Sequence, residues 1–431
     1  MKKYSSWNNY PKIISKNNIS IERDKKYSFD NGKYIPYGLG KSYGDVCLNE
    51  NENLLITNKL DKIINFNKEE GILNCEAGVS FEAILDFIIK DGWFLPVVPG
   101  TRYITLGGAI ANDIHGKNHH KNGSFGNFIE SFKLLRSNNE ILDCTPDQNK
   151  EYYKATIGGL GLTGTILSAK IKLIKINNQL IKGETIRFSS LNEYWELNER
   201  LEKTYNYVVS WVDCKFDKDN EIRGIIHAGN HSEENATTKK KRNIKINFPF
   251  TPPFSFINNL TMKFINEIYF RINKNNKHKE QDYKNFFFPL DSIVSWNKAY
   301  GLRGFFQYQF VVPVDSGKES IKKVLKKIKQ HGQIPALGVL KNFGSIPPNG
   351  ILSFPREGVT LALDFPNKGK KTLDLLNELD EIIVHYGGAV YPAKDARMSK
   401  AVFYSSFPKI YEFINYIDKN FSSSFWRRVN K

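Results

Sequence analysis

The stretch from residue 97 to residue 127, VVPGTRYITLGGAIANDIHGKNHHKNGSFGN, constrains this chain more than any other. Six of its residues are glycine, three are histidine, and Asp113 is its single acidic residue. Because glycine has no Cβ, a backbone so rich in it can approach a ligand closely. Exposed N–H groups in such a loop favour phosphate. Taken alone, the stretch is equally consistent with a glycine-rich surface connection, because short motifs also match by chance.

Two further glycine-rich loops lie in the same region of the chain. One is GLGKSYG at 38–44, which matches neither a Walker loop nor the Rossmann fingerprint. The other is ATIGGLGLTGTI at 155–166, which leads into a strand expected at 165–176. Three such loops, each attached to strands, share one explanation. They predict a large phosphate-bearing cofactor that is held mainly by main chain.

Hydrophobic periodicity around these loops predicts an α+β fold. Short apolar runs are followed by one amphipathic helix, which is capped by Ser80 and stopped by Gly92. Strands followed by a single helix indicate α+β layering rather than regular βαβ repeats. The elements expected here are strands at 54–57, 63–66 and 72–76, the helix after residue 80, and a hairpin formed by 131–136 and 140–142.

The pattern changes near residue 182, where strands begin to alternate with longer helices. This predicts three parts: a cofactor-binding domain at 1–181, a substrate domain at 182–386 and a tail at 387–431 that returns to the first domain. The second part reads as a sheet covered by helices on one face. Within it, the aromatic and proline-interrupted segment 244–272 is either a lipid-facing lid or domain core. The last helix is expected at 409–419.

Composition limits the class of protein. The formal charge of +17 favours anionic partners such as phosphates or an anionic membrane surface. Cysteines 47, 75, 144 and 214 lack zinc spacing, so reduced thiols in the cytoplasm are expected. Neither a secretory signal nor an apolar run of about 20 residues is visible. We therefore expect a cytoplasmic protein, with peripheral contact to the inner face of the plasma membrane left open.

Five segments together resemble one enzyme family. They are GLGKSYGD, the block from 99 to 127, ATIGGLGLTGTI, the run FFFPLDSIVSWNKAYGLRGFFQYQFVVP at 286–313, and GGAVYPAKDAR at 387–397. The chain is similar to the FAD-dependent oxidase components of decaprenylphosphoryl-β-D-ribose 2′-epimerases, within the vanillyl-alcohol-oxidase/PCMH flavoprotein superfamily. The likeness covers nearly the whole chain. It implies a PCMH-type FAD-binding domain of two α+β subdomains and an α+β substrate domain with an antiparallel sheet.

The resemblance also implies where FAD would bind. Many members attach FAD through a histidine in the first loop. This chain has Lys41, Ser42 and Tyr43 there, so non-covalent FAD is expected. The implied positions are Gly38, Leu39, Gly40, Lys41, Ser42, Tyr43 and Gly44 at the pyrophosphate; Gly100, Thr101, Gly107, Gly108, Asn112, His115, Gly116, Asn118 and Tyr391 along the flavin; and Gly161, Gly164 and Ile166 on the adenine and ribose side.

The chemistry implied by the family is oxidation of a secondary alcohol by hydride transfer to the flavin. Lys394 matches the lysine that contacts flavin and substrate, and Tyr391 precedes it as in the relatives. His115 would orient the substrate or tune the flavin. We take these three as catalytic. The implied substrate-binding positions are Tyr43, Gln307, Gln309, Lys341, Phe343, Thr360 and Lys394.

Two positions depart from the family pattern. Ala362 stands where some members carry a cysteine beside the flavin, so turnover is expected to persist while a target for thiol-reactive inhibitors is lost. Thr360 replaces an asparagine, which bears on sugar recognition.

The implied substrate is a lipid-linked sugar phosphate, such as a polyprenylphosphoryl pentose oxidised at its 2′-hydroxyl. The implied partner is a reductase of the short-chain dehydrogenase type that completes the epimerisation.

Three other interpretations compete with this one. A metal site at His115, His119 and His120 lacks a nearby acidic or cysteine ligand and any common zinc spacing, so we expect no metal. A sugar-1,4-lactone oxidase of the same superfamily would share the flavin site but usually keeps the covalent histidine. A non-catalytic basic protein would bind nucleic acid or membrane with steep salt dependence and would carry no flavin. We expect no nucleic-acid partner.

Overall fold

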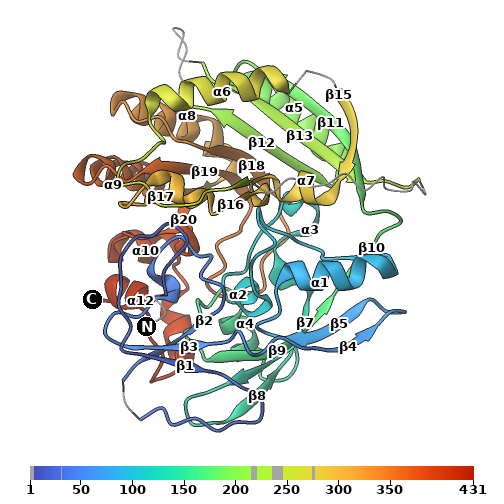
Figure 1. Cartoon of the computed structure of the whole chain (residues 1–431), viewed down its shortest axis with the longest axis vertical. Helices are drawn as coiled ribbons and strands as arrows, with labels where there is room; N and C mark the ends of the chain where they lie inside the picture. The colour runs from blue at the N-terminus through green and yellow to red at the C-terminus, as the bar shows by residue number, and fades with distance from the viewer. Residues whose placement is uncertain (1–3, 31, 215–220, 235–245, 274–276) are drawn as a thin grey trace.

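The chain folds into two stacked layers with a cavity between them. The computed structural model describes residues 4–30, 32–214, 221–234, 246–273 and 277–431. In Figure 1 the lower layer contains the early strands and helix α1, and the upper layer contains the large sheet with its helices. The red C-terminal segment runs back to the lower layer, beside the N-terminal end of the chain. The mixture of helices and antiparallel sheets confirms the predicted α+β class.

A five-stranded antiparallel sheet, in the order β4-β5-β9-β7-β8, forms one half of the lower layer. Helix α1 (Phe81–Ile88) begins at Ser80, whose hydroxyl accepts the Ala83 N–H, and the turn after it ends at Gly92 with φ 78°. The strands and the helix therefore lie where the sequence predicts them. The strands are β4 (Ile63–Asn67), β5 (Ile72–Glu76), β7 (Ile129–Leu135), β8 (Ile141–Cys144) and β9 (Thr165–Lys172).

A small parallel sheet, β1-β3-β2, completes the lower layer. Its strands are β1 (Asn17–Ser20), β2 (Tyr34–Tyr37) and β3 (Asn53–Ile56). The strand expected at 165–176 is divided, because the chain leaves β9 and then pairs β10 (Ile174–Lys175) with β6 (Trp93–Phe94). Short helices fill the connections: α2 (Leu106–Ala111), α3 (His119–Asn122) and α4 (Lys150–Thr156).

The upper layer is an eight-stranded antiparallel sheet in the order β15-β11-β13-β12-β18-β19-β17-β20. Its last strand, β20, lies beyond residue 386 and still pairs with β17. The tail thus contributes one strand to the sheet of the preceding part. The division of the chain into three parts stays a prediction. The strands are β11 (Leu180–Phe188), β12 (Tyr207–Asp213), β13 (Arg223–His231), β15 (Lys277–Asp282), β17 (Phe305–Val312), β18 (Gly338–Phe343), β19 (Gly358–Pro366) and β20 (Ala389–Val390). Two short strands, β14 (Ile246–Asn247) and β16 (Ile293–Val294), pair separately.

Helices cover the sheet face that points away from the lower layer. In strand β17, Tyr308 points to this face and packs towards helix α9, where the Tyr308 hydroxyl donates to Asp380 Oδ1 at 3.0 Å. Its neighbours Gln307 and Gln309 face the cavity instead. The helices on this face are α5 (Leu191–Thr204), α8 (Val314–Gln330) and α9 (Lys370–His385). Helices α6 (Asn259–Ile272) and α7 (Tyr283–Phe287) lie on the cavity side.

The tail differs from the expected pattern at one helix. Instead of a helix over 409–419, helix α11 (Ile410–Phe413) tightens into a 3₁₀ turn that ends at Tyr416. The Asp418 carboxylate accepts hydrogen bonds from the N–H groups of Ser137 and Asn420. The chain around Asp418 is therefore a loop that is held by side-chain contacts and is not helical. Helices α10 (Lys400–Ser406) and α12 (Ser424–Val429) complete the chain.

Candidate active site

A cavity of about 1180 Å³ separates the two layers. This exceeds the ~300–1,000 Å³ of ordinary small-ligand pockets, so it has room for a dinucleotide and a second molecule. Most of the predicted site residues line it together. They are Gly38, Leu39, Gly40, Lys41, Ser42, Tyr43, Gly100, Thr101, Gly107, Gly108, Asn112, His115, Gly116, Gly161, Gly164, Ile166, Gln307, Gln309, Lys341, Tyr391 and Lys394.

Four predicted positions lie behind this lining. Phe343 packs against His115, with ring centroids 4.8 Å apart, and Thr360 accepts a hydrogen bond from Gln309. Asn118 donates to the Pro96 carbonyl at 2.8 Å, and Gly44 lies against the backbone of Asp395. Phe343 and Thr360 therefore support residues of the lining, and direct contact between any of the four and a ligand stays a prediction.

The lower wall of the cavity is built largely from main chain. Helix α2 begins at Thr105, whose hydroxyl accepts the Gly108 N–H at 3.2 Å and so holds the start of this helix at the cavity. Gly40 has φ 62°, and a Cβ there would lie 2.0 Å from the Tyr37 hydroxyl. Only glycine allows this turn to pass so close to strand β2.

The upper wall presents polar side chains from the large sheet. Gln307 and Gln309 point down from β17, and Lys341 points down from β18, on the other side of β19. Each is buried. Strand alternation places residues two apart on one face, so these polar groups replace the apolar residues that a buried sheet face normally carries.

A hydrogen-bonded chain joins the two walls through His115. Lys341 Nζ lies 2.9 Å from His115 Nδ1 and donates to the Gly116 carbonyl at 3.0 Å, while Gln309 Nε2 lies 2.9 Å from His115 Nε2. Burial, followed by the charges of Lys117 and Lys394, holds the pKa of Lys341 well below its ordinary value. These contacts join Lys341, His115 and Gln309 into one buried polar chain across the cavity.

Lys394 lines the cavity from a short turn of the returning tail. Its Nζ lies over the Tyr43 ring, 3.9 Å from the centroid. Burial lowers the pKa of Lys394, and the nearby Asp364 carboxylate opposes that shift. Asp364 itself is buried, which raises its pKa, and its Oδ1 accepts from Gln307 Nε2 at 2.6 Å. Sequence reasoning did not give Asp364 a role, because its partners come from distant strands.

Tyr391 connects the tail to the lower wall. Its hydroxyl donates to the Asn112 carbonyl at 2.9 Å, and its ring stacks on Phe354 with centroids 4.3 Å apart. Burial raises the pKa of Tyr391 far above its usual value, so the phenol stays protonated. Tyr391 therefore positions the loop that carries Lys394, three residues later.

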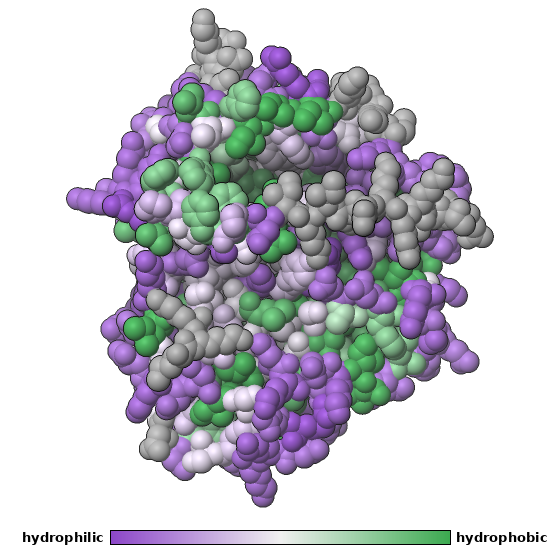
Figure 2. Space-filling model, in the orientation of Figure 1, coloured by the Kyte–Doolittle hydropathy of each residue, from purple (hydrophilic) through white to green (hydrophobic). Residues whose placement is uncertain are grey.

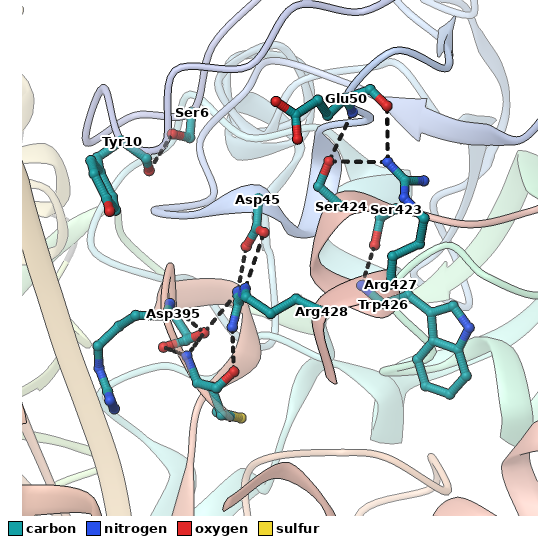
Figure 3. A network of polar contacts seen from close by, with 12 residues as sticks. Ser6, Tyr10, Asp45, Glu50, Asp395, Ser423, Ser424, Trp426, Arg427 and Arg428 are labelled. Carbon is teal, nitrogen blue, oxygen red and sulfur yellow. Dashed lines mark hydrogen bonds and ion pairs between the residues drawn. The ribbon is translucent and has the colours of Figure 1, made fainter. Parts of the chain in front are cut away.

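Arg428 of helix α12 links the two loops that deliver Tyr43 and Lys394. Its Nη2 lies 2.6 Å from Asp45 Oδ1 and 3.1 Å from Asp395 Oδ2. Figure 3 shows the guanidinium between the two carboxylates. Asp45 follows Tyr43 by two residues, and Asp395 directly follows Lys394. The sequence signalled only a basic end to the chain, so this ion-pair cluster was not predicted.

Two half-buried lysines add positive charge to the cavity. Burial lowers the pKa of Lys41 to about 8 and that of Lys117 to about 8. Lys41 lies 3.6 Å from the centroid of the Trp7 ring. Lys117 was not singled out from the sequence, although it lies in the central glycine-rich block. Such desolvated cations suit phosphate groups.

The three histidines of the central block have separate partners. His119 Nδ1 accepts the Gly344 N–H at 3.1 Å, and His120 Nε2 lies 2.9 Å from the Tyr205 carbonyl. His115 belongs to the chain described above. Among the described residues, no three His, Cys, Asp or Glu side chains converge as a metal site would require.

Comparison with known proteins identifies the family. An FAD-binding-domain model matches residues 26–145. The chain is 36% identical over 391 residues to decaprenylphosphoryl-β-D-ribose oxidase of Mycolicibacterium smegmatis, covering 88% of this chain and 84% of that protein. The chain belongs to the decaprenylphosphoryl-β-D-ribose oxidase family. It is an FAD-dependent oxidoreductase, as the sequence motifs predicted.

The chain is also similar to two other proteins. The chain is 26% identical over 351 residues to an uncharacterized protein of Streptomyces coelicolor, covering 78% of this chain and 94% of that protein. A putative D-arabinono-1,4-lactone oxidase of Neurospora crassa is 26% identical over 137 residues, covering 32% of this chain and 24% of that protein. Within the described residues, none of the helices combines the length and apolar character needed to span a membrane.

Proposed function

We propose that this oxidase converts the 2′-hydroxyl of a polyprenylphosphoryl pentose, similar to decaprenylphosphoryl-β-D-ribose, into a 2′-keto sugar. This is the first half of a 2′-epimerisation. The observation that carries the proposal is the 36% identity over 88% of the chain to an oxidase named for that substrate. The cavity supports it, because Lys41 and Lys117 add positive charge for a phosphate-bearing substrate or cofactor.

The lining fits FAD. Glycines at 38, 40, 107, 108 and 161 leave the lower wall open to a flat or phosphate-bearing ligand, and the buried Oδ1 of Asn112 has no hydrogen-bond partner among the described residues. The 38–44 loop would hold the pyrophosphate, and α2 with Asn112 and His115 would lie along the flavin. Because this loop contains no histidine, non-covalent binding is proposed.

Oxidation of an alcohol transfers a hydride from the carbon to an acceptor and releases the hydroxyl proton to the medium, so the substrate oxygen must be stabilised as its proton leaves. FAD, when bound, supplies the hydride acceptor. Lys394 stabilises the negative charge that develops on the substrate oxygen as its proton leaves. His115, kept neutral by burial and by Lys341, orients the sugar, while Tyr391 fixes the loop of Lys394. The buried walls exclude water from the reacting atoms.

The upper wall would recognise the sugar. Gln307, Gln309 and Lys341 offer amide and amine groups at the level of Lys394, and Tyr43 closes the same region from the lower loop. Ala362 also lines the cavity, so a thiol-directed inhibitor has no cysteine to attack at this position. Thr360 acts on the sugar only through Gln309.

The product of this reaction requires a second enzyme for net epimerisation. We propose a reductase of the short-chain dehydrogenase type that returns hydride to the opposite face of the keto sugar. A substrate whose lipid lies in a bilayer further implies peripheral contact with that membrane, proposed here on its cytoplasmic face.

The first experiment is spectroscopic. We expect the purified protein to show oxidised-flavin absorption that acid precipitation releases into the supernatant. Anaerobic addition of a polyprenylphosphoryl ribose should bleach this absorption, while a sugar-1,4-lactone should not. Bleaching by the lactone alone would assign the chain a lactone-oxidase activity instead. A protein that neither carries nor takes up FAD would overturn the proposal.

A further inference from the structure

Helix α6 exposes an apolar stripe to solvent. Residues four apart lie along one line of a helix. In α6 this line contains Leu260, Phe264, Ile268 and Ile272, whose exposed fractions are 78%, 68%, 42% and 71%. A helix of a globular protein normally turns such a stripe towards the core. Here the stripe points outwards.

The loop before α6 continues this surface. Phe250, Phe254 and Phe256 are 60%, 64% and 41% exposed. More than half of the exposed large hydrophobic side chains among the described residues lie between 250 and 294. Figure 2 shows hydrophobic residues gathered at the top of the molecule, where Figure 1 places α6. We call Phe250, Phe254, Phe256, Leu260, Phe264, Ile268 and Ile272 the α6 apolar surface.

The same helix forms part of the cavity wall. Met262, Ile265 and Tyr269 line the cavity, and Tyr269 packs against Trp211 of β12 with ring centroids 4.9 Å apart. Asn266 Nδ2 donates to Asp213 Oδ1 at 2.7 Å and ties α6 to the sheet. Ile272 belongs to both the cavity lining and the exposed stripe. The apolar surface is therefore continuous with the entrance to the active site.

Positive charge borders this surface. Lys263 is exposed, and the one acidic residue of α6, Glu267, is paired with Arg223 at 2.7 Å and Arg271 at 2.6 Å. With its acid neutralised in this way, the helix presents apolar and basic groups together. An interfacial helix on an anionic bilayer has this combination of an apolar face and flanking basic residues.

We propose that the α6 apolar surface docks the enzyme on a lipid bilayer that carries anionic headgroups. This rests on the proposed function, since a lipid-linked sugar must reach the cavity while its chain stays in the membrane. Docking through α6 brings the cavity entrance to the bilayer surface. The sugar phosphate then enters past Ile272 and Tyr269, and the apolar chain remains among the lipids.

The experiment compares two triple variants of the full-length, FAD-loaded protein. The test variant is Leu260→Ser, Phe264→Ser, Ile268→Ser, at three positions that do not belong to the cavity lining. The matched control is Ile14→Ser, Ile64→Ser, Ile141→Ser, at exposed positions outside the α6 apolar surface. Flotation with vesicles of phosphatidylcholine, with and without phosphatidylglycerol, measures binding.

We expect the wild type and the control to float with the anionic vesicles and the test variant to bind at least about tenfold more weakly. Flavin reduction by a short-chain, water-soluble substrate analogue should be equal in all three proteins. Reduction by substrate embedded in vesicles should fall only in the test variant. The single variant Phe264→Glu gives the same comparison if the triple variant folds poorly.

Other outcomes would overturn the docking proposal. A wild type that stays unbound, or a test variant that binds as well as the wild type, would do so. A wild-type dimer that the test variant converts to a monomer, without vesicle binding, would make this face an interface between copies. Vesicle binding without turnover of any lipid-linked pentose would instead contradict the proposed function and leave the docking surface standing.

Discussion

The two walls of the cavity differ in what they present to a ligand. The lower wall is made of short glycine-rich loops and the start of α2, and it offers main-chain groups. The upper wall is a sheet, and it offers the side chains of Gln307, Gln309 and Lys341. Lys394 enters between them on the returning tail.

This difference separates two tasks. Main-chain contacts depend on local backbone shape, so they suit a large cofactor that is the same for every family member. Side chains on a sheet can be exchanged without changing the backbone, so they are suited to binding a particular substrate and to catalysing its reaction. The comparison predicts that changes in the upper wall alter the rate, and changes in the lower wall alter cofactor retention.

The largest effect is expected for Lys394→Ala. Loss of this cation should slow flavin reduction by substrate about 10²- to 10⁴-fold, while FAD remains bound to the lower wall. Stopped-flow absorbance measures the rate, and the ratio of flavin to protein absorbance measures retention. Lys400→Ala, at an exposed position of helix α10, is the control. Wild-type-like reduction in Lys394→Ala would remove this lysine from the mechanism.

Arg428→Met tests the link between the two loops. It leaves the buried carboxylates of Asp45 and Asp395 without their cation, so we expect the free energy of unfolding to fall by about 3 kcal/mol. We use the low end of the range for broken buried pairs because the Arg428 side chain is 26% exposed. Denaturant unfolding measures the change.

The neighbouring variant Arg427→Met is the matched control, because Arg427 donates to the neutral Asn49 side chain and the Glu50 carbonyl. Arg427→Met should lower the free energy of unfolding by less than Arg428→Met does, and it should leave the rate of flavin reduction by substrate unchanged. Equal losses in the two variants would show that the cluster around Arg428 contributes nothing specific.

Gly100→Val tests whether the lower wall binds the cofactor. A Cβ at Gly100 meets no atom within 4 Å, so the fold should tolerate the change, yet the residue lines the cavity. We expect FAD affinity to fall about tenfold, roughly 1.4 kcal/mol, and Gly100→Ala to show a smaller loss. Fluorescence titration of the apoprotein with FAD measures both. Unchanged affinity with a lower rate would contradict the assignment of this wall to the cofactor.

The smallest expected effect is a pH shift in Asp364→Asn. Burial lowers the pKa of Lys394, and the Asp364 charge partly restores it, so removing that charge lowers the pKa further. If Lys394 acts as a cation, the rate of flavin reduction falls as pH rises through its pKa. In the variant, this decline should begin at lower pH.

Asp380→Asn is the control for this pH profile, because Asp380 lies on the helix-covered side of the sheet with Tyr308. Its profile should match that of the wild type. A faster reaction at neutral pH in Asp364→Asn would mean that Lys394 acts instead as a neutral base.

Much of the lower wall was predictable because its determinants are local. The glycine-rich loops, the cap at Ser80 and the strand around residue 165 depend on neighbours in sequence, and local patterns report such structure well. The same holds for the family motifs around His115 and Lys394. The helix expected at 409–419 is present but ends at Tyr416, and Asp418 beyond it makes contacts with a distant loop.

The sequence by itself therefore determined the α+β class, the glycine-rich loops and the family. Only the tertiary structure decided how the walls interact. Asp364 reaches the environment of Lys394, and Arg428 joins Asp45 to Asp395, because strands and loops far apart in the chain meet at one place. The sequence left segment 244–272 open as a lipid-facing lid or domain core, and only the structure shows that the apolar stripe of α6 points outwards. Its periodicity is that of a core helix, and packing alone decides which face of a helix is buried.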